Sequence, residues 1–249
     1  CANLTLLFGE FAFKERFARA KEAGFDAVEI LFPYDEPVPE IVDALSFNRL
    51  DMALINSPPP NYTGGVQGFA AVPDAQQRFR SDMRRVMRYA KALKAGRVHL
   101  MAGNAAGDTA RTCFVENLRW ATAEHPAQQF TIEPLNSGDR PAYFLNDYHQ
   151  ALEILAEVDA PNLGLQFDTY HAAKIHGGFA AVWDQVRARV THVQIGAAPN
   201  RSEPAGKTFA RFFDRLDADG YDGWVSAEYH PRTTTLAGLG WFAPYKDAR

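Results

Sequence analysis

Four short apolar runs decide the fold of this chain: FTIEP (130–134), LGLQFD (163–168), HVQIG (192–196) and WVSAEY (224–229). Each run ends at or near a side chain with an oxygen ligand, namely Glu133, Asp168, Gln194 and Glu228. The separations between these residues are 35, 26 and 34 positions, which is the usual length of one strand plus one returning helix. The four side chains are therefore predicted to occupy equivalent places in successive βα units.

Outward from these runs, eight segments have the composition of strands: 2–8, 25–32, 51–56, 97–102, 129–134, 163–168, 190–195 and 223–229. Segments with helical spacing lie between them, including two that stop before Gly24 and Gly96 and four at 109–124, 146–158, 178–188 and 207–219. Alternating strands and helices favour a parallel sheet, and eight strands favour its closure into one (β/α)8 barrel domain over 1–249. An open doubly wound sheet is disfavoured because no G-x-G-x-x-G follows the first strand.

Composition limits the partners of the chain. Its 249 residues are 47% hydrophobic, and no linker or low-complexity tract divides them. A net charge of −4 offers no general attraction to nucleic acid or anionic lipid, so we expect neither as a partner. Two cysteines are too few for a disulfide framework, which favours a reducing, cytoplasmic location. The longest uncharged stretch, 52–73, contains PPP and GG and is not expected to cross a membrane. We also do not expect Cys1 to bear a lipid, because no polar tether follows it.

The alternation of side chains along a strand tests whether the four oxygen ligands share one side. Residues two apart point the same way, so the polar sets are Thr131 with Glu133, Gln166 with Asp168, His192 with Gln194, and Ser226 with Glu228 and His230. Glu29 and His99, in earlier strands, are further candidates to face the barrel interior. Polar side chains that point inward at carboxyl strand ends are typical of a barrel active site.

An oxygen-only, carboxylate-rich cluster is the ligand set of a hard divalent cation rather than of zinc or copper. We therefore predict one Mg²⁺ or Mn²⁺ ion at this mouth. Gln194 is neutral, so the three carboxylates around a dication leave one excess negative charge.

The stretches FTIEPLN, LQFDTYH, HVQIG and GYDGWVSAEYHP resemble the hydroxypyruvate isomerase family, within the xylose-isomerase-like barrels, which includes 2-oxo-tetronate isomerases. The resemblance extends to GFDAVEILFPYD, NSPPPNYTGGVQGFAAVP, YFLND and GLGW and so covers nearly the whole chain. It implies a TIM barrel, a divalent metal and the interconversion of a hydroxy-ketone with a hydroxy-aldehyde in a small keto acid. By the same resemblance the metal ligands fall on Glu133, Asp168, Gln194 and Glu228, and the catalytic pair on Glu133 and Glu228.

One loop departs from the family pattern. Residues 196–208 read GAAPNRSEPAGKT where relatives commonly read like ADxPGRHEPGTGE, so Ala197 and Thr208 replace acidic residues while Arg201 and Glu203 are kept. We expect Arg201 to bind a substrate carboxylate, because guanidinium pairs with carboxylate through two hydrogen bonds, and Glu203 to position Arg201. His171 is expected to bind a substrate oxygen or to orient a metal ligand.

The reaction that these residues support moves a carbonyl between adjacent carbons through an enediolate, as in the conversion of hydroxypyruvate to 2-hydroxy-3-oxopropanoate (tartronate semialdehyde). Two glutamates would act as base and acid, and segment 56–72 as a lid. The alternatives are a 2-oxo-tetronate isomerase or a ketose epimerase or isomerase. A non-catalytic sugar-acid-binding barrel and an abasic-site endonuclease are alternatives of another class.

The apolar stretch LAGLGWFAPY (236–245) would cover the barrel or mediate a homo-oligomer.

Overall fold

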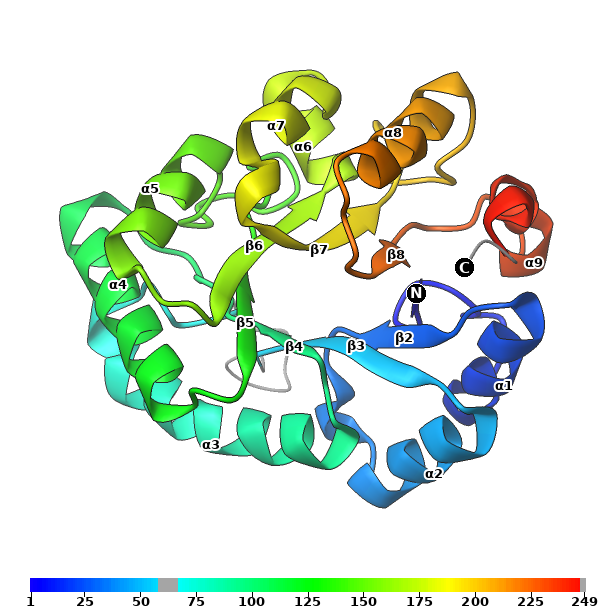
Figure 1. The fold of residues 1–249 in the computed structure, drawn as a ribbon. Coiled ribbons are helices and arrows are strands. Elements are labelled where there is room, and N and C mark those ends of the chain that lie inside the picture. The colour runs from blue at the N-terminus through cyan, green and yellow to red at the C-terminus, as the bar shows by residue number, and fades with distance from the viewer. Residues whose placement is uncertain (58–66, 247–249) are drawn as a thin grey trace.

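The computed structural model describes residues 1–57 and 67–246, and in this part of the chain eight parallel strands form a closed barrel (Figure 1). The strands are β1 (Ala2–Asn3), β2 (Ala27–Ile30), β3 (Asp51–Asn56), β4 (Arg97–His99), β5 (Gln129–Ile132), β6 (Leu163–Asp168), β7 (Val190–Ile195) and β8 (Val225–Ala227). Each strand pairs with the next, and β8 returns to β1 through Ala227 and Ala2. The predicted (β/α)8 TIM barrel is confirmed.

Helices surround this barrel (Figure 1). They are α1 (Phe13–Ala23), α2 (Val38–Asn48), α3 (Gln76–Leu93), α4 (Gly107–Glu124), α5 (Tyr148–Val158), α6 (Thr169–His176), α7 (Ala180–Val186), α8 (Lys207–Ala218) and α9 (Thr235–Gly238). Short 3₁₀ helices lie at Pro33–Asp35, Pro73–Ala75, Arg187–Arg189, Leu239–Trp241 and Ala243–Tyr245.

The ends of two early helices illustrate different stop signals. Gly24 ends α1 in the left-handed conformation, with φ 103°, and its N–H caps the carbonyls of the last turn, as the sequence predicts. The end of α3 is different, because Lys94 takes the left-handed position with φ 51° two residues before Gly96. A non-glycine residue there costs conformational energy, which is why the sequence pointed to the glycine instead.

Several strands are shorter than expected. The carbonyl of Asn3 accepts hydrogen bonds from the N–H groups of Leu6 and Leu7, so the chain turns directly after β1. The apolar residues that followed in the predicted strand are nevertheless buried, Leu4 and Leu7 among them. Apolar content therefore marked core residues correctly but overestimated the length of the extended segment.

The two faces of the barrel wall have different chemistry. On the outer face, Phe167 of β6 packs against Trp183 and Phe212, whose ring centroids lie 5.3 and 6.0 Å away. On the inner face, Thr131 donates to Gln166 across β5 and β6, and both side chains are buried. Apolar residues thus attach the helices, while polar residues fill the inside of the barrel.

The C-terminal segment packs on its own barrel. Phe242 stacks on Phe25 at a ring-centroid distance of 4.5 Å, and Trp241 Nε1 donates to the hydroxyl of Tyr229. The segment with α9 lies between α8 and α1, where it completes the outer ring of helices (Figure 1). Of the two roles predicted for 236–245, this packing favours covering the barrel.

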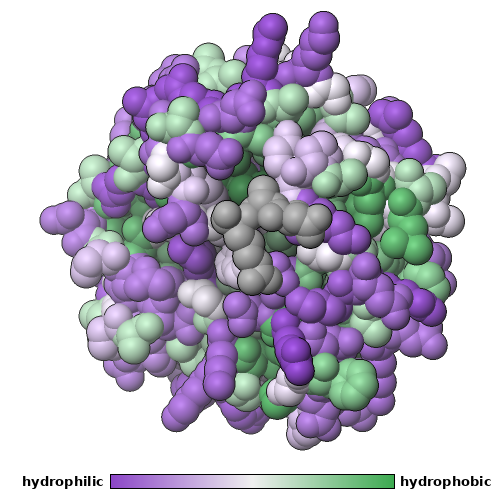
Figure 2. All heavy atoms as spheres, turned by 45° about the vertical axis from the view of Figure 1, so that its right-hand side comes forward, coloured by the Kyte–Doolittle hydropathy of each residue, from purple (hydrophilic) through white to green (hydrophobic). Residues whose placement is uncertain are grey.

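Two observations concern a membrane or a second subunit as partner. Among the described residues, every helix is too short or too polar to span a bilayer. In the view of Figure 2, polar side chains cover most of the coloured surface, and apolar ones form small separate groups. The homo-oligomer therefore stays a prediction.

Candidate active site

The strand ends bring the four predicted oxygen ligands into one site. Asp168 pairs in register with Gln194, while Glu133 and Glu228 each follow directly after their strands, β5 and β8. All four residues are at least 95% buried. Gln166 lies among them, because its Nε2 donates to Glu133 Oε2 at 2.8 Å and to Gln194 Oε1 at 2.7 Å.

Arg201 joins the other two carboxylates of this cluster. Its Nη2 lies 2.8 Å from Asp168 Oδ2 and 2.9 Å from Glu228 Oε1. Arg201 is in the left-handed backbone conformation, with φ 49°, inside a loop closed by the bridge between Ala197 and Ser202. The loop after β7 thus places one guanidinium over two of the three acidic side chains.

Burial and mutual repulsion make the cluster a strong acceptor of cations. Burial raises the pKa of Asp168 to about 6, against the opposing charge of Arg201. It also raises the pKa of Glu133 well above the ordinary range, and the charges of Glu228 and Asp168 add to this. The pKa of Glu228 is raised well above its ordinary value by burial, although Arg201 acts against the rise. A bound proton or a bound metal ion would stabilise each of these buried carboxyl groups.

The donor set fits a hard divalent cation. Glu133 Oε1 and Glu228 Oε2 are buried and have no hydrogen-bond partner among the described residues. Such an unsatisfied acceptor is costly unless a proton or an ion meets it. Three carboxylates carry −3, Arg201 adds +1 and a dication adds +2, so Arg201 removes the excess negative charge expected from the ligands alone.

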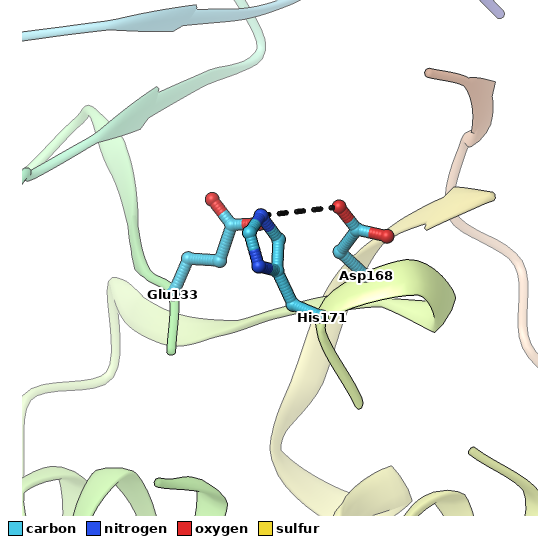
Figure 3. A group of neighbouring side chains, drawn as sticks. All are labelled: Glu133, Asp168 and His171. Atoms are coloured by element: carbon cyan, nitrogen blue, oxygen red, sulfur yellow. Dashed lines mark ion pairs between the residues drawn. The ribbon is translucent and has the colours of Figure 1, made fainter. Parts of the chain in front are cut away.

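His171 lies against the same carboxylates but is held as a donor. Glu133, Asp168 and His171 each offer an atom within 4.8 Å of the others, and Figure 3 shows the His171 ring beside both carboxylates. The backbone N–H of Asn136 donates to His171 Nδ1 at 3.0 Å. Burial, together with Arg201, holds the pKa of His171 well below its usual range, so the ring is neutral and its proton is on Nε2. That Nε2–H points at Asp168 Oδ2, 3.7 Å away, and has no lone pair for a metal.

Glu203 is not brought to Arg201. Its Oε1 accepts from the backbone N–H of Arg232 at 2.8 Å, and its Oε2 pairs with the Arg232 side chain at 3.3 Å. The structure therefore pairs Glu203 with Arg232 and not with Arg201, unlike the positioning expected from the sequence. Glu203 instead fastens the loop after β7 to the segment that follows β8.

A cavity of about 360 Å³ opens above the cluster. Its lining includes Glu133, Glu228, His171, Arg201, His230 and Arg140. Arg140 was missed from the sequence, and its place in the loop after the Glu133 strand was the only available signal. Asn56 and Gln67, two described residues of the expected lid, also line the cavity. The rest of that prediction falls mainly on 58–66, outside the described residues.

A closed parallel barrel with a carboxylate cluster at the carboxyl ends of its strands is typical of TIM-barrel enzymes. The model of the xylose isomerase-like TIM barrel family matches residues 17–245, and the chain belongs to this family.

Curated relatives narrow this class to isomerases. A 2-oxo-tetronate isomerase of Cupriavidus necator is 40% identical over 252 residues, covering 98% of this chain and 97% of that protein. The hydroxypyruvate isomerase of Escherichia coli is 35% identical over 253 residues, with 98% of each chain covered. The resemblance seen in the sequence is confirmed, and the chain is an isomerase of this group.

A solved structure agrees with the fold over its whole length. The crystal structure of AP endonuclease, family 2 from Brucella melitensis has a TM-score of 0.94 and 37% sequence identity, covering 99% of this chain and 98% of that one.

Proposed function

We propose that the protein is a metal-dependent isomerase of a small keto or hydroxy acid that acts through an enediolate. The favoured reaction is the interconversion of hydroxypyruvate and 2-hydroxy-3-oxopropanoate. The main support is the pair of buried glutamates, Glu133 and Glu228, each with one unpartnered oxygen beside the same cavity. They come from β5 and β8, with β6 and β7 between them, so they reach the cavity from separate parts of the mouth.

Glu133 and Glu228 are suited to move the proton. Aldose–ketose interconversion removes a proton from one carbon and delivers one to its neighbour, and a positioned acid or base contributes about 10²- to 10⁴-fold. The raised pKa values of both groups bring them closer to the operating pH than an exposed carboxylate would be. Arg201 holds the Glu228 carboxylate by one oxygen and leaves the other free.

A divalent cation, Mg²⁺ or Mn²⁺, would be held by Glu133, Asp168, Gln194 and Glu228 and would supply Lewis-acid stabilisation of the developing negative charge. His171 would donate its Nε2 proton to a substrate oxygen, as its hydrogen bond from Asn136 requires.

The substrate carboxylate needs a cationic partner that is not already occupied. Arg201, the residue expected from the sequence, is bonded to Asp168 and Glu228. Arg140 lines the same cavity, is exposed, and has no ion pair among the described residues. We therefore place the substrate carboxylate at Arg140, with Arg201 close to the reacting carbons.

The test is turnover of hydroxypyruvate in D₂O by metal-stripped protein before and after Mg²⁺ or Mn²⁺ is restored. We expect metal-dependent formation of the aldehyde with solvent deuterium in the product, abolished in Glu133→Gln and Glu228→Gln. Turnover that ignores both substitutions would overturn the assignment of the acid and base.

A four-carbon 2-oxo-tetronate is the second candidate substrate, because the 40% identical relative bears that name. A substrate panel decides between the two acids by kcat/KM and should include a neutral ketose. Duplex DNA with an abasic site belongs in the same panel because of the name of the Brucella structure. We expect no cleavage, since the net charge of −4 disfavours DNA binding.

A further inference from the structure

Below the carboxylate cluster, Glu29 of β2 is fully buried inside the barrel. Its carboxylate accepts N–H groups from Asn3 Nδ2 and Gln194 Nε2, both at 2.8 Å, and lies 2.7 Å from His192 Nε2. These three groups come from β1 and β7. An ionised carboxylate only accepts hydrogen bonds, so each of the three nitrogens would turn a proton toward Glu29.

The contact with Glu29 sets the direction of the Gln194 amide. A side-chain amide has one NH₂ end and one oxygen end, and the hydrogen-bond network decides which way each faces. Because Glu29 accepts, the NH₂ of Gln194 must face it, and Oε1 must face the opposite way.

The hydrogen bonds of Gln166 agree with this direction. Its Nε2 donates to Gln194 Oε1 and also to Glu133 Oε2, and its own Oε1 accepts from the hydroxyl of Thr131. Gln194 Oε1 thus faces the side on which Glu133 lies. A reversed Gln194 amide would set NH₂ against NH₂ at Gln166 and leave a carbonyl oxygen against the Glu29 carboxylate.

The direction of the amide matters because a hard cation is bound by carbonyl oxygen and not by NH₂. We propose that Glu29 is a positioning residue, which fixes the Gln194 amide with its oxygen toward the cation site. This inference rests on the ligand set of the proposed function. It adds a second role for a buried carboxylate that otherwise pairs with His192 and accepts from Asn3.

The experiment measures Mn²⁺ affinity of the metal-stripped, full-length protein by electron paramagnetic resonance of free Mn²⁺, with the thermal midpoint measured on the same samples. Glu29→Gln is expected to weaken Mn²⁺ binding by about 10- to 100-fold, the usual effect of losing a partner that orients a ligand. Asn3→Ala is the matched control, since it removes another buried hydrogen bond to the same carboxylate and leaves Gln194 in place. It should lower the midpoint with less than about a threefold change in affinity.

A double exchange, Glu29→Gln with Gln194→Glu, keeps the charge of the pair and reverses donor and acceptor. It is expected to restore Mn²⁺ affinity to at least that of the parent. It also serves if Glu29→Gln alone fails to fold. Parental affinity in Glu29→Gln, or equal losses in Glu29→Gln and Asn3→Ala, would overturn the inference.

Gln194→Met separates this inference from the proposed function. Unchanged Mn²⁺ affinity in Gln194→Met would show that the ligand set itself is wrong. Weaker binding in Gln194→Met together with parental binding in Glu29→Gln would leave the ligand set intact and remove only the role of Glu29.

Discussion

Arg201 sets the charge of the site in the absence of metal. Its guanidinium is the cation that bridges Asp168 and Glu228, both almost fully buried. Removing one partner of a buried ion pair leaves the other charges uncompensated, at a cost of about 3 to 5 kcal/mol. The loop after β7 is therefore part of the stability of the barrel and not only of its active site.

We expect Arg201→Met to lower the unfolding free energy of the metal-free protein by about that amount, 3 to 5 kcal/mol. Arg215→Met is the control, because the Arg215 pairs are exposed and should contribute little to stability. Urea unfolding in the presence of a chelator measures both. Similar small losses in the two variants would show that Arg201 is not acting as a buried counter-charge.

Arg140 gives a prediction about substrate charge. Arg140→Met should raise KM for hydroxypyruvate by about 10- to 100-fold, with little change in kcat. This factor corresponds to the binding free energy that one hydrogen bond to a charged group contributes. Arg84→Met provides a control on α3, where the guanidinium donates to Ser81 and, in the described part of the chain, forms no ion pair. Steady-state kinetics with the acid and with a neutral ketose test the idea. An equal rise in KM for both substrates would contradict it.

At the residue scale, the sequence predicted what strand geometry determines. Glu133, Asp168, Gln194 and Glu228 were found because each ends an apolar run and alternation fixes the side on which it lies. The role of Arg140 and the tautomer of His171 depend on loop conformations, which no periodic pattern encodes. The mistaken role of Glu203 has the same cause, since two residues of loop decide whether it faces Arg201 or Arg232.

At the scale of the elements, the end of β7 leaves little room for a side chain. A Cβ added to Gly196 would lie 2.9 Å from the Glu228 carbonyl oxygen and 3.3 Å from Arg201 Cγ. The first of these contacts is with backbone, which cannot rotate away. Gly196 thus allows β8 and the Arg201 loop to approach β7 closely.

Gly196→Ala is expected to displace Glu228 and Arg201 together and to reduce kcat by at least about tenfold, since small misplacements of reacting groups are costly. Gly178→Ala should be neutral, because its Cβ would meet nothing within 4 Å. Kinetics and the thermal midpoint of both variants give the comparison. Full activity in Gly196→Ala would show that the close approach is not required.

Element boundaries were predicted less well than element order. Helix 146–158 was placed within two residues, because Asp147 is a recognisable cap that accepts from His149 and Gln150. The segment 2–8 was predicted as one strand although it turns after Asn3, since buried turn residues have the same apolar composition as strand residues. Helix α6 was not predicted, because it begins directly after β6, with Asp168, the last residue of that strand, as its N-cap.

For the whole molecule, the raised carboxyl pKa values link folding to pH and, in the proposed function, to metal binding. The pKa of Asp168 rises from 3.8 to about 6 on folding, so its contribution to stability is present at low pH and is lost as the pH rises through 6. The proposed dication would reverse this effect, because it would favour the ionised form, and protons would compete with it below that pH.

We therefore expect the Mn²⁺-induced rise in thermal midpoint to be larger at pH 7 than at pH 5. Affinity should fall by about tenfold for each pH unit below 6, if one proton is displaced per ion. Thermal unfolding with and without Mn²⁺ at pH 5, 6 and 7 measures the effect. Equal shifts at pH 5 and pH 7 would mean that the ion does not bind at these carboxylates.

The closure of β8 onto β1 has a consequence for synthesis. Glu133 and Glu228 are 95 residues apart, and the second of them is synthesised directly after the strand that completes the barrel. Asp168 and Arg201 are synthesised earlier, before the second carboxylate that Arg201 contacts. The closed wall and the proposed acid–base pair therefore become complete at the same point of synthesis, and a truncated product that ends before β8 lacks Glu228.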